Sequence, residues 1–399
     1  MESRGMELVR TVPIQDPGPL IDAVPFSDSL LWLHGDEGMA GWGIAARFEV
    51  SGPGRFEHAR RWFRRWLAQR NVDDRVGLPG SGPVAFGSFT FDHGPGRSVF
   101  VIPQVLIARR GGASWMTTVG DPCHPDGTVP HPLPNVRWLT EPDAEARFHK
   151  QVTRAVDDIR AGRLHKVVLA RDVRGLLGGP FDPRTAVTRL HERFPGCWTF
   201  AVDGLVGASP ELLTGRFGRM VKSLVLAGTD WPGGAIGLGT EKTAVEHELA
   251  ADSAEDVLRA HCSELNVHEP HELELANVTH LATRISGTLS HNVDALTLAS
   301  RLHPTAAVCG TPFRESLELL RELENLDRGR YAGPVGWQDA RGDGEWCIAL
   351  RCAEVKGPDL RLFAGCGIVG DSNPTSEWHE TEAKLGAIRD LFAEPSCVK

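Results

Sequence analysis

The sequence predicts an α+β protein, in which helices cover sheets built from many short strands. Short apolar runs alternate with Gly/Pro turns through the first 140 residues, a pattern typical of strands. Longer segments later in the chain place apolar residues at helical spacing, which predicts amphipathic helices. The 399 residues are enough for one large compact unit or for two domains.

Composition argues against several classes of function. The formal net charge is −9, and no cluster of lysine and arginine stands beside aromatic residues, so a nucleic-acid partner is not expected. The N-terminus lacks the apolar core of a signal peptide, and no apolar run approaches the length of a bilayer span. We therefore expect a cytoplasmic protein without a membrane partner. The eight cysteines include no C-x-x-C pair, which argues against a zinc site or a disulfide scaffold.

The first 140 residues are expected to form a sheet with one covering helix. Residues 57–70 have the pattern of a basic amphipathic helix, and Trp62 and Trp66 space its apolar side. A membrane-surface role is conceivable for this helix, but a helix that covers the sheet is favoured. A proline-rich loop is expected at 124–134. The expected strands lie at residues 30–33, 84–91, 98–103 and 104–108.

Lys166 lies inside an expected buried strand. After a helix predicted at 140–161, residues 164–171 form a nearly continuous apolar run, the pattern of a strand buried on both faces. The ammonium group must reach solvent, pair with a carboxylate or be held neutral. A structural lysine paired with a carboxylate is the alternative to a functional one.

Glu211 follows Pro210 at a stiff turn that leads into a leucine pair. A helix at 184–194 and strands at 198–202 and 205–206 are expected before it. A glutamate between a rigid turn and apolar residues is a candidate for a partly buried acid with a raised pKa.

A second carboxylate, Glu246, lies on an expected helix at 241–262. The strand before it, at 222–226, ends in a small-residue turn at 227–229 that could bring backbone close to an anion. Glu246 falls inside an apolar arc that begins at Val245 and includes Ala250. A carboxylate there is costly unless it is paired or binds a cation.

The stretch 365–384 combines a glycine-rich turn with the start of a helix near residue 374. Ser372 or Asn373 can cap this helix, and Pro374 suits its first position. Three charged residues share the arc beside its apolar face, at i, i+3 and i+7: Glu377, Glu380 and Lys384. The alternative is a solvated acidic turn that complements the helix dipole.

These charges together predict a small dianionic substrate bridged by a divalent metal. Arg351 interrupts an expected apolar strand at 346–352, as Lys166 interrupts its own strand. Oxygen ligands favour magnesium, and the histidines contain no H-E-x-x-H zinc motif. Residues 365–370 match G-x-G-x-x-G, but the strand–helix–strand unit that a dinucleotide site requires is missing.

Taken in order, these motifs resemble the chorismate-utilising enzymes, and most closely the isochorismate synthases. The matching segments are 165–171, 208–213, 226–229, 242–247, 280–287, 331–337 and 365–384. The resemblance implies the chorismate-binding fold, with large, mostly antiparallel sheets covered by helices and two similar subdomains around a central cleft. It implies one enzyme unit over 1–399, with a variable strand-rich part at 1–140 and a catalytic part at 145–390.

The resemblance also implies a role for each matching residue. Lys166 would be the base that activates water for attack at C2 of chorismate, and Glu211 the acid that protonates the departing C4 hydroxyl. Glu246 and Glu380 would bind Mg²⁺, Glu377 would assist nearby, and His280 would lie beside the reacting ring. The positions that would hold the substrate carboxylates are Gly228, Thr229, Tyr331, Arg351, Gly367 and Lys384.

Two positions bear on the product. Lys166 stands where the ammonia-using relatives have a different residue, often glutamine, so water is the expected nucleophile and no amidotransferase subunit is expected. Ala307 stands where salicylate synthases, which also expel pyruvate, tend to have threonine. The prediction is an isochorismate synthase, with a salicylate synthase or a weakly active chorismate-binding homologue as alternatives.

Other positions depart from the family pattern. Thr243 and Ala244 stand where an acidic residue and often a basic one precede the glutamate, and Val225 and Trp231 also differ. A monomer is expected. The product would serve siderophore or menaquinone biosynthesis or another pathway.

Overall fold

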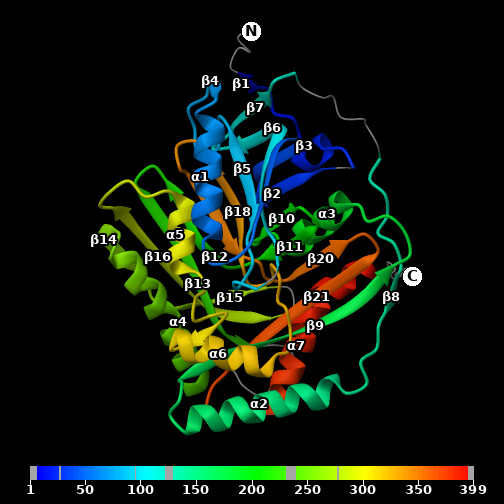
Figure 1. Cartoon of the computed structure of the whole chain (residues 1–399), viewed down its shortest axis with the longest axis vertical. Coiled ribbons are helices and arrows are strands. Elements are labelled where there is room, and N and C mark those ends of the chain that lie inside the picture. The colour runs from blue at the N-terminus through cyan, green and yellow to red at the C-terminus, as the bar shows by residue number, and fades with distance from the viewer. Residues whose placement is uncertain are drawn as a thin grey trace.

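The sheet of this protein branches at one long strand. The structure, a computed structural model, describes residues 7–26, 28–94, 96–121, 129–230, 240–275 and 278–393, without the side chains at 241 and 242. Within these ranges 21 strands join into one sheet (Figure 1). At the branch point, β6 (Ser98–Arg110) pairs along one edge with β3 (Glu37–Val50). Its other edge pairs first with β5 (Val84–Ser88) and then with β7 (Ala113–Val119).

Beyond β7 the sheet ends in two strands near the N-terminus. β7 pairs with β1 (Glu7–Ile14), which pairs in turn with β4 (Arg70–Asp74). The β1–β4 ladder is parallel, and every other ladder between described strands is antiparallel. The predicted class of large, mostly antiparallel sheets with covering helices is therefore confirmed.

The first branch runs from β3 to the strand that carries Lys166. Its order is β2 (Leu30–His34), β10 (Trp198–Val202), β11 (Leu205–Ser209), β20 (Cys352–Lys356), β21 (Asp359–Ile368) and β9 (Lys166–Leu177). Two short strands cover the ends of the outer edge of β9: β17 (Gly310–Thr311) and β8 (Val136–Trp138).

The second branch runs from β5 to the strands that adjoin the long helix. Its order is β18 (Pro334–Asp339), β19 (Gly344–Ile348), β12 (Leu212–Phe217), β13 (Met220–Asp230) and β16 (Thr279–Leu289). The outer edge of β16 carries β14 (Cys262–Val267) and β15 (His271–Glu274).

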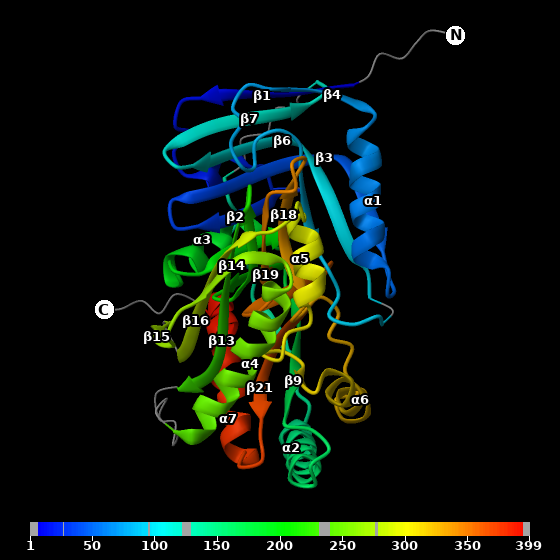
Figure 2. The ribbon, with the colours of Figure 1, turned by 90° about the vertical axis from the view of Figure 1, so that its left-hand side faces the viewer.

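Helices pack on both branches (Figure 2). On the second branch lie α4 (Glu241–Arg259) and α5 (Ala295–Leu302), and α1 (Arg55–Leu67) packs on α5 and on β3. On the first branch lie α2 (Ala144–Arg160), α3 (Pro183–Arg193), α6 (Phe313–Leu323) and α7 (Pro374–Arg389). Two 3₁₀ turns complete the described elements: Leu20–Ala23 and Asp390–Phe392. No described helix is long and apolar enough to cross a bilayer.

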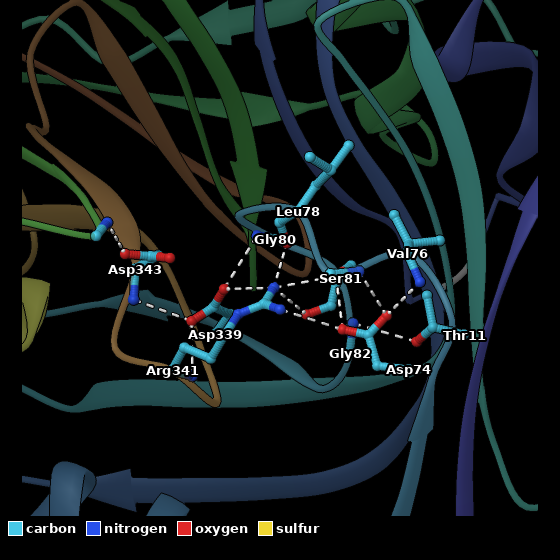
Figure 3. A network of polar contacts seen from close by, with 12 residues as sticks. Thr11, Asp74, Val76, Leu78, Gly80, Ser81, Gly82, Asp339, Arg341 and Asp343 are labelled. Carbon is cyan, nitrogen blue, oxygen red and sulfur yellow. Dashed lines mark hydrogen bonds and ion pairs between the residues drawn. The ribbon is translucent and has the colours of Figure 1, made fainter.

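A polar network ties the N-terminal strands to the second branch (Figure 3). The buried Asp339, at the end of β18, accepts hydrogen bonds from the backbone amides of Gly80, Arg341 and Asp343. Arg341 reaches the side chain of Ser81, 3.0 Å away, which in turn donates to Asp74 at 2.6 Å. The network lies at the end of the second branch close to β1 and β4, so it fixes the N-terminal strands on the rest of the sheet.

Local patterns located most of the expected elements correctly. The predicted helices at 57–70, 140–161, 184–194, 241–262 and near 374 correspond to α1, α2, α3, α4 and α7 within a few residues. Asn373 caps α7, because its Oδ1 accepts from the amides of Thr375 and Ser376 at 3.0 and 3.2 Å. The expected loop at 124–134 lies partly outside the described residues.

Four predictions of detail were wrong. The two strands expected at 98–103 and 104–108 are one strand, β6, because Pro103 lies at the register shift between β6 and β3. The turn expected at 227–229 is a bulge inside β13, between Ala227 and Thr229. Arg351 lies in the break between β19 and β20, with φ of 44°, rather than inside a strand. Val245, where the expected apolar arc of α4 begins, is 43% exposed.

Candidate active site

One cavity lies between the two branches of the sheet and contains most of the predicted site residues. It encloses about 630 Å³ of empty space, including its mouth. β9 and β21 line it from the first branch, while β13 and β16 line it from the second, with α4 and α7 contributing one side chain each. The predicted residues on its wall are Glu211, Gly228, Thr229, Glu246, His280, Ala307, Tyr331, Arg351, Gly367 and Lys384.

Lys166 lies just behind this wall and pairs with Glu246. Its side chain is fully buried, and Nζ is 3.1 Å from Oε1 of Glu246 and 3.4 Å from the carbonyl oxygen of that residue. Breaking such a pair by removing one partner typically costs about 3–5 kcal/mol, since the other charge stays buried. Of the alternatives that the sequence left open for Lys166, the structure shows a lysine paired with a carboxylate at the cavity.

Gly367 makes room for the carboxylate of Glu246. A Cβ at position 367 would lie 2.0 Å from Oε1 of Glu246 and 3.1 Å from Cε of Lys166. No side chain fits there without displacing the pair. Although Val245 is exposed, Glu246 still lies beside the buried face of α4, which runs through Thr243, His247 and Ala250.

Glu211 has the environment of a protonated acid. It lies between β11 and β12 and is 3% exposed. Burial raises the pKa of Glu211 to about 8, although the amide of Leu226 and the charges of Lys166 and Arg351 act in the opposite direction. The carboxyl group is therefore mostly protonated at neutral pH and can donate a proton into the cavity.

His280 and Arg351 form a buried couple in the wall of the cavity. The guanidinium Nη2 of Arg351 lies 2.6 Å from Nε2 of His280, and Nδ1 of the imidazole lies 3.2 Å from the Thr229 hydroxyl and 3.4 Å from the Gly228 carbonyl. Burial, and then the charge of Arg351, hold the pKa of His280 well below its usual value. Because Arg351 has donors alone, Nε2 must accept and Nδ1 carries the proton. The neutral imidazole of His280 thus accepts from Arg351 and holds its guanidinium in one orientation.

The remaining wall is shaped by small residues and one stacked aromatic pair. The ring of Tyr331 stacks on Phe363, with centroids 5.1 Å apart and planes 7° from parallel. A Cβ at Gly365 would come within 3.1 Å of the Tyr331 hydroxyl. Gly228 has φ of 73°, and a Cβ there would lie 3.1 Å from the backbone oxygen of Thr243, so the bulge of β13 needs glycine.

α7 carries Glu377 and Glu380, two of the residues expected at the metal site. Nζ of Lys384 donates to Oε1 of Glu380 at 2.6 Å and to the carbonyl of Gly365 at 3.0 Å, which fixes this face of α7 against β21. Glu380 is 7% exposed, and Glu377, one helical turn earlier, is 1% exposed. The solvated acidic turn considered as an alternative is therefore excluded for these two residues.

The donor chemistry of these glutamates fits a hard divalent cation. Glu246 and Glu380 offer carboxylate oxygens near neighbouring positions of β21, since Glu246 adjoins Gly367 and Lys384 joins Glu380 to Gly365. Each carboxylate is held by a lysine, and among the described residues no three His, Cys, Asp or Glu side chains gather closely enough to hold a metal by themselves. An ion here would therefore need oxygens from the substrate or water as well.

The sequence missed several residues that shape this cavity. Phe363, which stacks on Tyr331, and Val168 on β9 look like ordinary core residues in the sequence. Thr243, a departure from the family pattern, is 2% exposed and packs beneath the Gly228 bulge. These contacts join segments far apart in the chain, and no local pattern indicates them.

Comparison with known proteins identifies the family. The model of the family described as "Chorismate binding enzyme" matches residues 21–121 and 127–393. The chain belongs to this family. The resemblance that the motifs indicated is thereby confirmed.

Relatives of this chorismate-binding chain have similar length and fold. Isochorismate synthase EntC of Escherichia coli (strain K12) is 37% identical over 62% of this chain and 67% of its own length. The vibriobactin-specific isochorismate synthase of Vibrio cholerae is 32% identical over 92% of both chains. MenF, the menaquinone-specific isochorismate synthase of Escherichia coli, has a structure that covers 96% of this chain and 94% of its own, with a TM-score of 0.78 and 25% identity.

Proposed function

We propose that this chain is an isochorismate synthase, an isomerase that converts chorismate into isochorismate. The observation that carries the proposal is Glu211, a buried acid with a pKa near 8 that shares one cavity with the Lys166–Glu246 pair. Exchange of a hydroxyl group for water requires a proton donor for the leaving group and a base for the water. The relatives named isochorismate synthases support the same activity.

The cavity suits a substrate with two carboxylates, such as chorismate. Arg351 and Lys384 place cationic groups on its wall, and the Gly228–Thr229 bulge offers backbone close to a ligand. The guanidinium of Arg351 can bind a carboxylate through two parallel hydrogen bonds, because His280 holds it in one orientation. Tyr331 and Phe363 close the cavity on one side with a flat stacked pair.

In this proposal Glu211 and Lys166 carry the chemistry. Glu211 donates its proton to the C4 hydroxyl as that group leaves, and Lys166 accepts a proton from the water that attacks C2. Each such proton transfer is typically worth about 10²–10⁴-fold in rate. Nζ of Lys166 lies 3.1 Å from Oε1 of Glu246, so the proposed base and a proposed metal ligand are in direct contact.

Magnesium is part of the proposal, with Glu246 and Glu380 as ligands and Glu377 nearby. When bound, the ion would neutralise these carboxylates and hold the ring carboxylate of the substrate. Ala307, which lines the cavity as a small side chain, supports release of isochorismate without loss of pyruvate. A monomer that acts in the cytoplasm completes the proposal, and light scattering and cell fractionation test these two points.

Incubation of the purified protein with chorismate, with and without Mg²⁺, tests the proposal directly. Chromatography should show isochorismate, and EDTA should abolish its formation. Salicylate with pyruvate would instead identify a salicylate synthase, and a product that requires ammonia would identify an aminating enzyme. Saturable binding of chorismate without any product would show that the chain binds chorismate but is not an enzyme. Lys166→Ala should remove turnover, and an active variant would refute the assigned mechanism.

A further inference from the structure

Where β9 passes the cavity, no strand among the described residues pairs with its outer edge. β17 pairs with β9 at Lys166 and Val167, and the amide of Val168 still reaches the carbonyl of Cys309 at 2.9 Å. Beyond that point two side chains, rather than a strand, form hydrogen bonds with the backbone groups of this edge. Nη2 of Arg328 donates to the carbonyl of Val168 at 2.6 Å, and a carboxylate oxygen of Glu324 accepts from the amide of Ala170 at 2.7 Å.

Glu324 and Arg328 bind each other while they satisfy this edge. Both side chains are 4% exposed, and Nε of Arg328 donates to Oε2 of Glu324 at 2.8 Å. The remaining amino group of the guanidinium, Nη1, donates to the carbonyl of Val308 at 2.8 Å. The guanidinium also lies 4.3 Å from the centre of the Phe91 ring.

The pair joins three segments that end at the cavity. Val168, two residues after Lys166, and Val308, next to Ala307, both line the cavity and are both held through their carbonyls by Arg328. Tyr331 lies three residues after Arg328, and its amide donates a hydrogen bond to the carbonyl of Arg328 at 3.0 Å. Neither Glu324 nor Arg328 lines the cavity itself.

We propose that Glu324 and Arg328 are a positioning pair that sets Lys166 relative to the walls formed by Ala307 and Tyr331. The inference rests on the proposed function, because it assigns the pair a purpose in that reaction. The planar fork of arginine can reach both carbonyls and the carboxylate at once, which the single ammonium of lysine cannot do. Removing two charges from water opposes folding, and apolar residues of similar volume would fill the same space at least as well. Packing alone therefore does not account for an ion pair at this position.

The far side of the pair is open to a small cation. A second hollow, with about 980 Å³ of empty space including its open mouth, is lined by Glu324 and Arg328 together with Phe91, Asp92 and Arg321. Truncation of Arg328 would extend this hollow to the carbonyls of Val168 and Val308. A free guanidinium ion can then occupy the vacated place from this side.

Arg328→Ala, assayed with and without millimolar methylguanidinium, tests the pair. Displacement of a reacting group by about 1 Å can cost 10²-fold, so we expect kcat for chorismate consumption to fall about 10- to 100-fold. The KM should stay within about threefold, since Arg351 and Lys384 are untouched. Methylguanidinium should restore kcat about tenfold in Arg328→Ala, whereas Arg328→Lys should stay impaired.

Arg259→Ala is the matched control. Arg259 pairs with Glu255 at the same i, i+4 spacing, but 61% of its side chain is exposed. This variant should keep its kcat and should not respond to methylguanidinium. A kcat for Arg328→Ala equal to that of the wild type, or a loss that follows the unfolded fraction and is not rescued, would overturn the proposal.

Glu324→Gln keeps the inference testable if Arg328→Ala does not fold or the wild type does not consume chorismate. Glutamine retains an acceptor for the amide of Ala170 but loses the charge that orients Arg328. Hydrogen exchange should show faster exchange at Val168 and Ala170 than in the wild type, while the amides of β13 stay protected. Unchanged exchange at both positions would refute the pair as a positioning device. Inactivity of the wild type alone would refute only the proposed function.

Discussion

Glu211→Gln tests two consequences of burying this acid, which are its ability to donate a proton to the substrate and its effect on the stability of the fold. Glutamine has nearly the shape of the protonated carboxyl group and can keep the contact of Glu211 with the amide of Leu226. It cannot donate a proton to a leaving hydroxyl group. We expect kcat to fall about 10²–10⁴-fold, the range for loss of one general acid.

The same substitution should change how stability depends on pH. The pKa of Glu211 is about 8 in the folded chain and near 4.5 for an ordinary glutamate, and burial is the cause. Between these values the unfolded chain has lost the proton that the folded chain still holds. The free energy of unfolding therefore falls by about 1.4 kcal/mol per pH unit as pH rises, which amounts to roughly 4–5 kcal/mol by pH 8. Below about pH 4.5 the group has no effect.

Urea unfolding from pH 5 to 9, alongside chorismate turnover, measures both effects. Glu211→Gln should approach wild-type stability at pH 5 and exceed it by several kcal/mol at pH 9. In the wild type, kcat should decline above about pH 8 as the acid loses its proton. Glu318→Gln, which changes an exposed glutamate on α6, should leave both profiles unchanged. The reasoning fails if Glu211→Gln keeps more than a tenth of the rate, or if its stability follows the same pH dependence as the wild type.

Three further substitutions probe the parts that hold the site together. Gly367→Ala should lower kcat by about 100-fold or more, because its Cβ would lie 2.0 Å from the Glu246 carboxylate. Gly386→Ala on α7 is the control, since its Cβ meets no atom within 4 Å. This variant should instead add about 0.5–1 kcal/mol of stability in urea unfolding. Arg171→Met should raise the Mg²⁺ concentration needed for half-maximal rate several-fold. The Arg171 guanidinium ties β9 to α7, because it lies 3.7 Å from the centre of the Trp378 ring and donates to the Thr381 hydroxyl. An unchanged Mg²⁺ titration would contradict this prediction. Asp339→Asn should lower the free energy of unfolding by about 1–3 kcal/mol while kcat stays within twofold. The lost acceptor serves the amide of Gly80, far along the sheet from the cavity. A loss of kcat without a loss of stability would be inconsistent with that role.

Local signals in the sequence were sufficient for the helices and for the strand that carries Lys166. The start of α7 follows from Asn373 and Pro374, whose cap acts within one helical turn. The apolar run around Lys166 indicates a strand buried on both faces, and Lys166 to Ala170 are all buried in β9. Periodicity and capping depend on residues a few positions apart, which is why they can be recognised without a fold.

Signals that depend on a distant partner were misjudged or missed. Arg351 looked like part of an apolar strand, yet the chain breaks there in a left-handed conformation and turns the guanidinium toward His280 on β16. Glu246 lies beside a buried face of α4, as its pattern predicted, although Val245, at the start of the expected arc, is exposed. Nothing near Glu324 in the sequence indicates that it accepts from the amide of Ala170. Nor does anything near Arg328 indicate that it donates to the carbonyls of Val168 and Val308.

The sequence alone determined which chemical groups this protein possesses and, through the order of its motifs, the family to which it belongs. The tertiary structure decided what those groups are able to do. The pKa of Glu211 rises because the branches of the sheet remove water from it, and Lys166 meets Glu246 because β9 and α4 pack across one cavity. Desolvation and ion pairing depend on the distances between segments 80 or more residues apart, and only the folded chain sets those distances.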